Sequence, residues 1–395
     1  MKFLFILPRF HTNQFQIVKS LIEINHDVEI FVQYFGKSED HSIVKPSLIK
    51  KSILSTFIFR FLDLKYDTIT ADKKKMKYFI PSQIDLFRQI KKCRPDVVIL
   101  RYSNLTAMCA YFICRLTKVK AKITYDQTPL YSSKNVSGNA VKTFLRKIIR
   151  KYISPKVRIT PVYTNNISKS NDNMENYYIS KYDYFVPFIV EVNEEIANRG
   201  YCFDEKINIL DIGKYRDYKN HFLLVDAINL IEYRRNLKVT IVGQVVNKEE
   251  QKYYDSLKTY IRMKNLNDVI RLEKNVEYSK MDQIYRHNDI FVLASKVESA
   301  SIAVLEAMAN GMVTISTDAN GTASYIVEGE CGYIFKTMDA KDLAAKIKMA
   351  ISDKSNIQRM GKNSYLNIKK NFTFRNYYLA LGEVLKKEFG ITIHR

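Results

Sequence analysis

The chain has 395 residues, of which 46% are hydrophobic and 26% are charged. This balance excludes a disordered protein, and the length exceeds what one hydrophobic core usually supports, so two domains are expected. The five cysteines include no C-x-x-C pair, which argues against a disulfide framework or a structural zinc site and favours a reducing compartment. No apolar run reaches the roughly 18–20 residues that span a bilayer.

The formal net charge of +22 is unevenly distributed. Residues 1–190 carry 32 Lys and Arg against 14 Asp and Glu, an excess of +18. Such an excess favours an anionic partner, either nucleic acid or the cytoplasmic leaflet of a membrane; a composition that only promotes solubility is the alternative. Residues 141–153 place apolar and basic side chains on opposite sides of a helical pattern, as in a helix lying on anionic lipid or in an ordinary domain helix. Residues 45–65 are a second candidate for lipid contact.

Short apolar runs alternate with helical patterns along the first half, which predicts a parallel sheet covered on both faces. We expect strands at 2–7, 27–33, 96–102, 122–126 and 158–164, and a helix at 12–25. The pattern breaks at Pro187, and we place a linker at 185–193. A second series follows, with strands at 207–213, 238–243, 269–274, 289–295 and 312–318, and helices at 221–234, 248–266, 279–288 and 300–310. The fold class is therefore α/β, with two doubly wound, Rossmann-like domains.

Glycine is concentrated in the second half, and this places the chemistry there. Only two glycines precede residue 199, whereas six of the ten later ones lie at predicted strand ends or just beyond: Gly213, Gly243, Gly311, Gly321, Gly329 and Gly332. Ligands of open α/β sheets bind beyond the carboxyl ends of the strands, and glycine lets the backbone approach a ligand closely.

The segment 295–311 joins a buried strand to a helix that is apolar nearly all round. Glu306 is the only charged residue between Glu298 and Asp318, so it needs a partner, either a nearby Lys or a ligand hydroxyl. Backbone N–H groups at the helix start, those of Ser301 and Ile302 among them, form an anion site that fits a pyrophosphate.

A basic turn, residues 213–220, follows the first strand of the second domain. Lys214 and Lys219 can reach the same crevice as the helix start and hold a diphosphate without a metal, because charge-assisted hydrogen bonds are worth roughly 1.5–3 kcal/mol each. A solvated basic turn is the alternative.

These motifs together resemble the GT-B retaining glycosyltransferases, specifically glycosyltransferase family 4. Gly213-Lys214 with Lys219-Asn220 is similar to the Gly-Arg-…-Lys-Gly element of that family. Glu298 and Glu306 match its pair of glutamates, and residues 306–311 resemble its Glu-Ala-Met-Ala-x-Gly motif. Residues 317–321 and 329–332 resemble its downstream loops.

The resemblance implies a fold, a substrate class and residue roles. The domains would be 1–188 for the acceptor and the membrane, 189–373 for the donor, and 374–395 for a helix that returns to the first domain, with the two domains facing across a cleft. Glu298, Lys214 and Lys219 would be catalytic. The donor would also contact Glu306, Gly213, Ser301, Ile302, Gly243 and Asn320. His11 and Asp126 are candidates for acceptor or sugar contact.

The implied reaction moves a hexose or N-acetylhexosamine from a nucleotide-diphosphate sugar, with a UDP-sugar favoured, to a glycan or lipid-linked acceptor. The resemblance also implies that the configuration is retained and that no metal or other cofactor is needed. It further implies a cytoplasmic location on the inner face of the membrane and a role in bacterial surface polysaccharide synthesis. The family's Phe-Gly is replaced by Ala300-Ser301, and Tyr125-Asp126-Gln127 stands where a His is often found. Base, sugar, acceptor, linkage and oligomeric state are therefore open.

Two other functions are weighed against this one. A nucleotide-sugar 2-epimerase has a similar architecture, but the Lys pair and the Glu spacing fit it less well. A nucleic-acid-binding protein would explain the basic half, yet no helix-turn-helix, RRM or zinc pattern is present, so no nucleic-acid partner is expected. A nicotinamide dehydrogenase is excluded because no G-x-G-x-x-G follows a strand.

Overall fold

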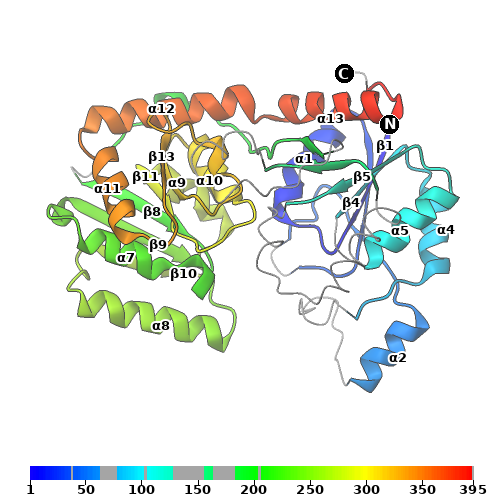
Figure 1. Ribbon diagram of the computed structural model, residues 1–395, viewed down its shortest axis with the longest axis horizontal. Helices are drawn as coiled ribbons and strands as arrows, with labels where there is room; N and C mark the ends of the chain where they lie inside the picture. The colour runs from blue at the N-terminus through cyan, green and yellow to red at the C-terminus, as the bar shows by residue number, and fades with distance from the viewer. Residues whose placement is uncertain are drawn as a thin grey trace. The chain divides into compact units, whose positions relative to one another are not determined.

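The computed structural model describes residues 1–36, 39–62, 78–101, 105–127, 155–162, 183–202 and 206–393. The chain divides into two compact units, each a sheet flanked by helices (Figure 1). The first unit comprises Met1–Pro161, Asn176–Phe188 and Phe374–Arg395, and the second comprises Val162–Glu175 and Ile189–Thr373.

The sheet of the first unit has the strand order β3-β2-β1-β4-β5-β6-β7, and every pairing in it is parallel. Its strands are β1 (Lys2–Leu7), β2 (Asp27–Val32), β3 (Ser47–Leu48), β4 (Val97–Arg101), β5 (Ala121–Tyr125), β6 (Arg158–Thr160) and β7 (Asp183–Phe185). The central strands are buried along most of their length, as a parallel sheet covered on both faces requires. Two strands of this sheet, β3 and β7, are missing from the sequence prediction and have only two and three residues.

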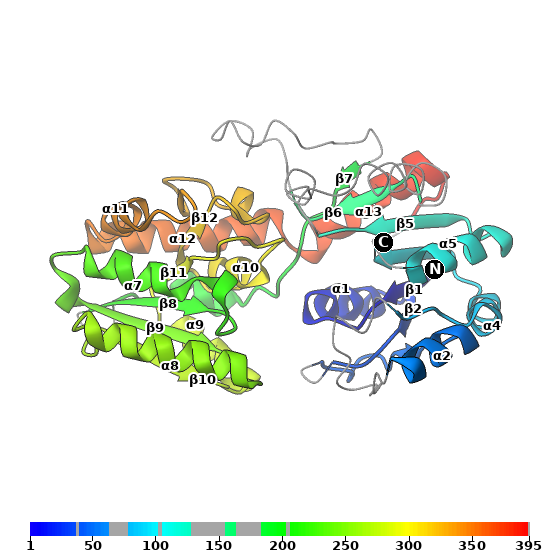
Figure 2. The same ribbon diagram turned by 60° about the horizontal axis from the view of Figure 1, so that its bottom comes forward.

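The helices of the first unit are α1 (Thr12–Glu23), α2 (Ile53–Phe61), α4 (Gln83–Cys93), α5 (Leu105–Leu116) and the C-terminal α13 (Phe374–Phe389). Although α13 lies at the end of the chain, it packs with the N-terminal strands (Figure 2). The Tyr378 hydroxyl lies 2.7 Å from His26 Nε2, and the Tyr184 hydroxyl donates a hydrogen bond to Glu388. The first unit is therefore completed by a segment from the far end of the sequence.

The sheet of the second unit has the order β10-β9-β8-β11-β12-β13, again with parallel pairings. Its strands are β8 (Ile207–Ile212), β9 (Leu237–Gly243), β10 (Ile270–Lys274), β11 (Ile290–Leu293), β12 (Val313–Thr317) and β13 (Gly332–Phe335). Its helices are α7 (His221–Asn229), α8 (Lys248–Met263), α9 (Met281–Arg286), α10 (Ile302–Ala309), α11 (Ala340–Ala350) and α12 (Lys354–Asn371). The predicted α/β class with two parallel sheets is confirmed.

Several helices end earlier than their sequence pattern predicts. Helix α7 ends at Asn229 rather than at 234, and the chain then passes through a short 3₁₀ turn, Arg234–Asn236. Ile231 stays buried in the core although it lies beyond the helix, so the apolar period continues where the helical hydrogen bonds do not. The spacing of apolar residues indicates which positions are buried, whereas the end of a helix is defined by its backbone hydrogen bonds.

Helix α13 offers a direct test of how much the first unit depends on it. Leu381 is fully buried, whereas Leu379 on the same helix is exposed. We expect Leu381→Ala to lower the free energy of unfolding by about 2–5 kcal/mol, because it leaves a cavity in the core. The matched Leu379→Ala should change it by less than about 0.5 kcal/mol. Urea denaturation followed by circular dichroism measures both, and equal effects would contradict the packing of α13.

Candidate active site

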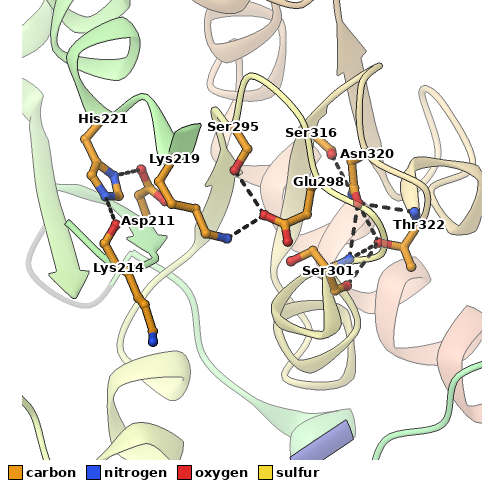
Figure 3. Close-up of polar contacts among 10 residues, drawn as sticks. All are labelled: Asp211, Lys214, Lys219, His221, Ser295, Glu298, Ser301, Ser316, Asn320 and Thr322. Atoms are coloured by element: carbon orange, nitrogen blue, oxygen red, sulfur yellow. Dashed lines mark hydrogen bonds and ion pairs between the residues drawn. The ribbon is translucent and has the colours of Figure 1, made fainter. Parts of the chain in front are cut away.

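The topology of the second sheet brings three polar loops to one edge. Strands β8, β11 and β12 are parallel neighbours, so their carboxyl ends lie together, where α/β sheets bind ligands. The loop after β8 is residues 213–220, the loop after β11 is 294–301, and the loop after β12 is 318–322. Figure 3 shows the polar side chains that these loops contribute.

An ion pair joins the first two loops. Lys219 Nζ lies 2.6 Å from Glu298 Oε2, and the Ser295 hydroxyl also donates to Glu298 Oε2, at 3.4 Å. The aliphatic stem of Lys219 crosses Gly213 so closely that a Cβ there would lie 2.9 Å from Lys219 Cδ. The structure thus brings together three residues that the sequence predicts for the site: Lys219, Glu298 and Gly213.

A second set of contacts fixes the same two loops to each other. Lys296 Nζ lies 2.7 Å from an Asp217 carboxylate oxygen, and the Lys296 N–H donates to the Tyr218 carbonyl oxygen at 2.8 Å. Asn220, which stands where the family has its second glycine, has a φ of 56°. Asn tolerates this left-handed conformation better than most residues, so the turn keeps its shape without glycine.

Glu298 is held from its other side by the loop after β12. The Glu298 N–H donates to the Ala319 carbonyl at 2.9 Å, and the Gly321 N–H donates to the Glu298 carbonyl at 3.1 Å. A Cβ on Gly321 would lie only 2.0 Å from the Ser299 carbonyl oxygen. A glycine is therefore required at this position for the two loops to approach.

Asn320 locks this arrangement with both ends of its buried amide. Its Oδ1 accepts hydrogen bonds from the N–H groups of Ser301 and Thr322, both at 3.2 Å, and its Nδ2 donates to the Ser316 hydroxyl at 3.0 Å. The sequence predicts that the Ser301 N–H and Asn320 contact the donor. In the structure they bond to each other, so the role the geometry supports for both is positioning of Glu298 (Figure 3).

Helix α10 carries Glu306, the other predicted glutamate, on its second turn. The Tyr285 hydroxyl donates to Glu306 Oε2 at 2.8 Å, so among the described contacts the partner is a tyrosine rather than the lysine considered from the sequence. Burial raises the pKa of Glu306, and the hydrogen bond from Tyr285 opposes this rise. Ser301 occupies the N-cap position of α10 but makes no side-chain hydrogen bond to the helix in the described chain; Ile302 is the first helical residue.

Lys214 is not brought to the Lys219–Glu298 pair. Its side chain extends away from Glu298 (Figure 3), and its carbonyl oxygen lies 3.3 Å from His221 Nε2. The prediction that both lysines reach one point is met by Lys219 alone in this structure.

A buried Asp–His pair lies beneath the basic turn, and sequence reasoning missed it. His221 Nδ1 lies 2.8 Å from Asp211 Oδ2, and both side chains are almost fully buried. Because His221 Nε2 also contacts the Lys214 carbonyl, the pair ties strand β8 and the start of α7 to the turn between them. The only signal in the sequence was a polar residue at each end of the turn.

Gly243 and the first-unit candidates have local partners. Gly243 ends β9, and a Cβ there would lie 2.3 Å from the Gly213 carbonyl oxygen, so packing alone requires glycine. His11 caps α1, where its Nδ1 accepts from the Asn13 N–H at 3.4 Å. Asp126 Oδ2 lies 3.6 Å from Arg158 Nη1, and Arg158 also pairs with Asp183. Their predicted roles toward acceptor or sugar stay predictions.

Metal ligands and membrane spans can be assessed for the described part of the chain. The described residues contain no group of three or more His, Cys, Asp and Glu side chains able to hold a metal ion. Within the same ranges, no helix has both the length and the apolar character needed to cross a membrane. The predicted lipid-binding helix 141–153 lies outside the described residues.

The two parallel sheets place the chain in the GT-B class of folds. A glycosyltransferase from Rickettsia africae superposes with a TM-score of 0.68 at 17% identity, covering 98% of both chains. Anabaena Alr3699/HepE, solved with UDP and glucose, superposes with a TM-score of 0.70 at 11% identity, covering 98% of this chain and all of the other. These likenesses establish the predicted fold.

The similarity to known families lies in the second unit. Residues 193–367, which lie within the second unit, match the family model described as glycosyl transferases group 1. The lipopolysaccharide core biosynthesis mannosyltransferase LpcC of Rhizobium leguminosarum is 28% identical over 45% of this chain. CapM, the capsular polysaccharide biosynthesis glycosyltransferase of Staphylococcus aureus, is 24% identical over 54%. The chain spans 35%, 50% and 51% of three of the curated relatives it matches.

The Asp211–His221 pair yields a stability prediction. We expect His221→Leu to lower the free energy of unfolding by roughly 3–5 kcal/mol, because it leaves the buried Asp211 carboxylate without its partner. The double variant Asp211→Leu/His221→Leu should recover part of this loss. His287→Leu, at an exposed histidine, is the control. Thermal unfolding measures all three, and a stable single variant would show that the pair does not hold the turn.

Proposed function

We propose that the protein is a retaining glycosyltransferase that uses a nucleotide-diphosphate sugar, with a UDP-sugar favoured, as donor. The observation that carries the proposal is the Lys219–Glu298 pair at the carboxyl edge of a group 1 domain, beside the start of α10. It supplies an ammonium group for a departing diphosphate and a carboxylate for sugar hydroxyls next to each other. Charge is thereby preorganised where it develops during transfer.

In the proposed reaction, the bond between the anomeric carbon and the diphosphate oxygen breaks while the acceptor oxygen bonds to the same face of that carbon. The acceptor hydroxyl proton passes to an oxygen of the leaving diphosphate. Lys219 stabilises the charge on the leaving group, and Lys214 joins it after a rotation of its flexible side chain. Glu298 orients the sugar through its hydroxyls and forms no covalent bond.

The rest of the donor is assigned to α10. Glu306 accepts hydrogen bonds from the ribose hydroxyls through its carboxyl oxygens. The N–H of Ile302 and those of the next residues in the first turn carry the positive end of the helix dipole toward the diphosphate. Because Ser301 and Asn320 are engaged with each other, we assign them to support rather than to donor contact.

We base the proposed substrate class on what the names of relatives and structural neighbours say of those proteins. Alr3699/HepE was solved with UDP-glucose and TarM of S. aureus with UDP, while LpcC and CapM are named for lipopolysaccharide and capsule synthesis. We therefore propose a hexose or N-acetylhexosamine as the transferred sugar and a surface glycan, or its lipid-linked precursor, as acceptor. All five cysteines are free, which agrees with action in the reducing cytoplasm.

Donor binding is tested by a thermal-shift panel of UDP-, GDP- and ADP-sugars. One nucleotide series should raise the melting temperature, because a ligand at 100 times its dissociation constant adds about 2.7 kcal/mol of stability. Glu306→Gln should remove most of that shift, since an amide presents one acceptor oxygen instead of two. Glu330→Gln, on a loop outside the site, is the control. If no nucleotide sugar shifts the melting temperature, the proposal fails.

Catalysis is tested separately from binding. We expect Lys219→Met to lower kcat by about 10²–10³-fold, the range found when one preorganised group that stabilises transition-state charge is removed. Because lysines take the role that a metal has elsewhere, EDTA should leave the rate of the native enzyme unchanged. NMR of the product reports its anomeric configuration, and omission of the acceptor separates transfer from epimerisation. An inverted product, or a sugar epimerised without acceptor, would contradict the mechanism.

A further inference from the structure

Helix α2 of the first unit turns its large apolar side chains outward. Ile53, Leu54, Phe57 and Phe61 are 91%, 58%, 66% and 80% exposed. At about 100° of rotation per residue, these positions fall within an arc of about 100°, so they form one stripe along the helix. We call these four residues the α2 face.

The opposite side of α2 is fixed to the body of the first unit by polar contacts. The fully buried Ser55 hydroxyl donates to the Tyr78 carbonyl at 3.0 Å and accepts from the Ile80 N–H at 3.2 Å. The Ser52 N–H donates to the Ile80 carbonyl at 2.8 Å, and the Ser82 N–H donates to the Lys50 carbonyl at 2.8 Å. The start and the inner side of α2 are therefore tied down with the apolar stripe outside.

This orientation is the reverse of that of an ordinary surface helix, which buries its apolar stripe. Helix α4, a neighbour in sequence, follows the ordinary rule, because its Leu86 and Ile90 are buried. Four large apolar side chains on a single exposed stripe are uncommon on a soluble monomer and mark a contact surface.

Charge identifies the partner. Residues 45–62 contain four basic residues, Lys45, Lys50, Lys51 and Arg60, and no acidic one. Arg60 lies on α2, and Lys50 and Lys51 shortly precede it. Lys50 pairs with Asp85 at 3.4 Å, but Lys50 is largely exposed and such a pair contributes little. Asp63 follows the segment directly, so with Asp85 two acidic residues stand against the four basic ones. An apolar stripe flanked by this excess of positive charge matches a lipid surface with anionic headgroups, whereas a second copy of the same face would bring two positive faces together.

We propose that α2 lies in the interface of an anionic membrane, with the α2 face among the acyl chains and the basic residues at the headgroups. The helix provides a docking element within the described residues, whereas in the sequence residues 141–153 are the first candidate for lipid contact and residues 45–65 the second. Docking through α2 does not depend on the proposed sugar transfer, so its test uses no activity.

The chain contains no tryptophan, which permits a single-site fluorescence test. Phe61→Trp introduces the only indole of the full-length protein on the α2 face, and Tyr233→Trp introduces it at a side chain of the second unit that is 77% exposed. With phosphatidylglycerol vesicles, the emission of the Phe61→Trp variant should shift to shorter wavelength and be quenched by brominated acyl chains. The Tyr233→Trp control should do neither, and phosphatidylcholine vesicles should have little effect.

Vesicle flotation measures the binding itself. We expect Phe57→Ser/Phe61→Ser to bind phosphatidylglycerol vesicles at least about tenfold more weakly than the unmodified protein, because two large apolar side chains no longer enter the membrane. Tyr233→Ser should bind as the unmodified protein does. Unchanged thermal unfolding shows that the double variant is folded, as expected when only exposed residues change.

Two results would overturn the proposal. The α2 helix would not be the docking element if the double serine variant still bound vesicles as the unmodified protein does. The same would follow if phosphatidylglycerol vesicles left the emission of the Phe61→Trp variant unchanged. The unmodified protein could instead be a dimer in size-exclusion chromatography and the double variant a monomer, with neither binding vesicles. That result would assign the α2 face to a contact between copies of the chain.

Discussion

The ion pair between Lys219 and Glu298 is the contact on which the site depends. Both side chains are mostly removed from water, with 12% and 20% of their surface exposed, and a pair in that position is stable only when its geometry is well supported. The supports come from three strands. The turn after β8 carries Lys219, the loop after β11 carries Glu298, and the loop after β12 grips the Glu298 backbone. A parallel sheet with neighbouring β8, β11 and β12 makes this possible.

The pair also leaves bonding capacity for a substrate. An ammonium group has three donors, and a carboxylate has about four acceptor sites, while the contacts with each other and with Ser295 fill only part of them. Under the proposed function, a diphosphate adds to Lys219 and a sugar hydroxyl adds to Glu298 without either leaving its place. The supporting Asn320 has less in reserve, because both ends of its amide are bonded to protein. This difference in unused bonding capacity distinguishes the residues proposed to bind the ligand, Lys219 and Glu298, from a residue that positions them, Asn320.

The sequence predicted the elements of the site better than their roles. Lys214 and Lys219 could be assigned in advance to the crevice at the helix start, because the carboxyl ends of parallel strands lie at one edge of the sheet. The pairing of Lys219 with Glu298 required the strand order, in which β8 and β11 are neighbours. Asn320 could be placed in the right loop from the sequence. The orientation of its amide, however, depends on its hydrogen bonds with the Ser301 N–H and the Ser316 hydroxyl. The Asp211–His221 pair was missed because nothing in the pattern distinguishes a buried polar residue from an exposed one. Its detection needed the fold of the turn between them.

Helix α2 also shows that a sequence pattern does not establish which residues are buried. The order of residues 53–61 shows an apolar stripe, yet it does not say whether that stripe faces the core or the solvent. The direction is set by the polar contacts of Ser55 and Ser52 with the segment after residue 77. Those contacts give hydrogen-bond partners to the buried Ser55 hydroxyl and to the backbone groups of Ser52 and Ile80, as buried polar groups require. The exposed stripe therefore lies opposite a side of α2 that is held by polar contacts, as the Lys219–Glu298 pair is held by the loops around it.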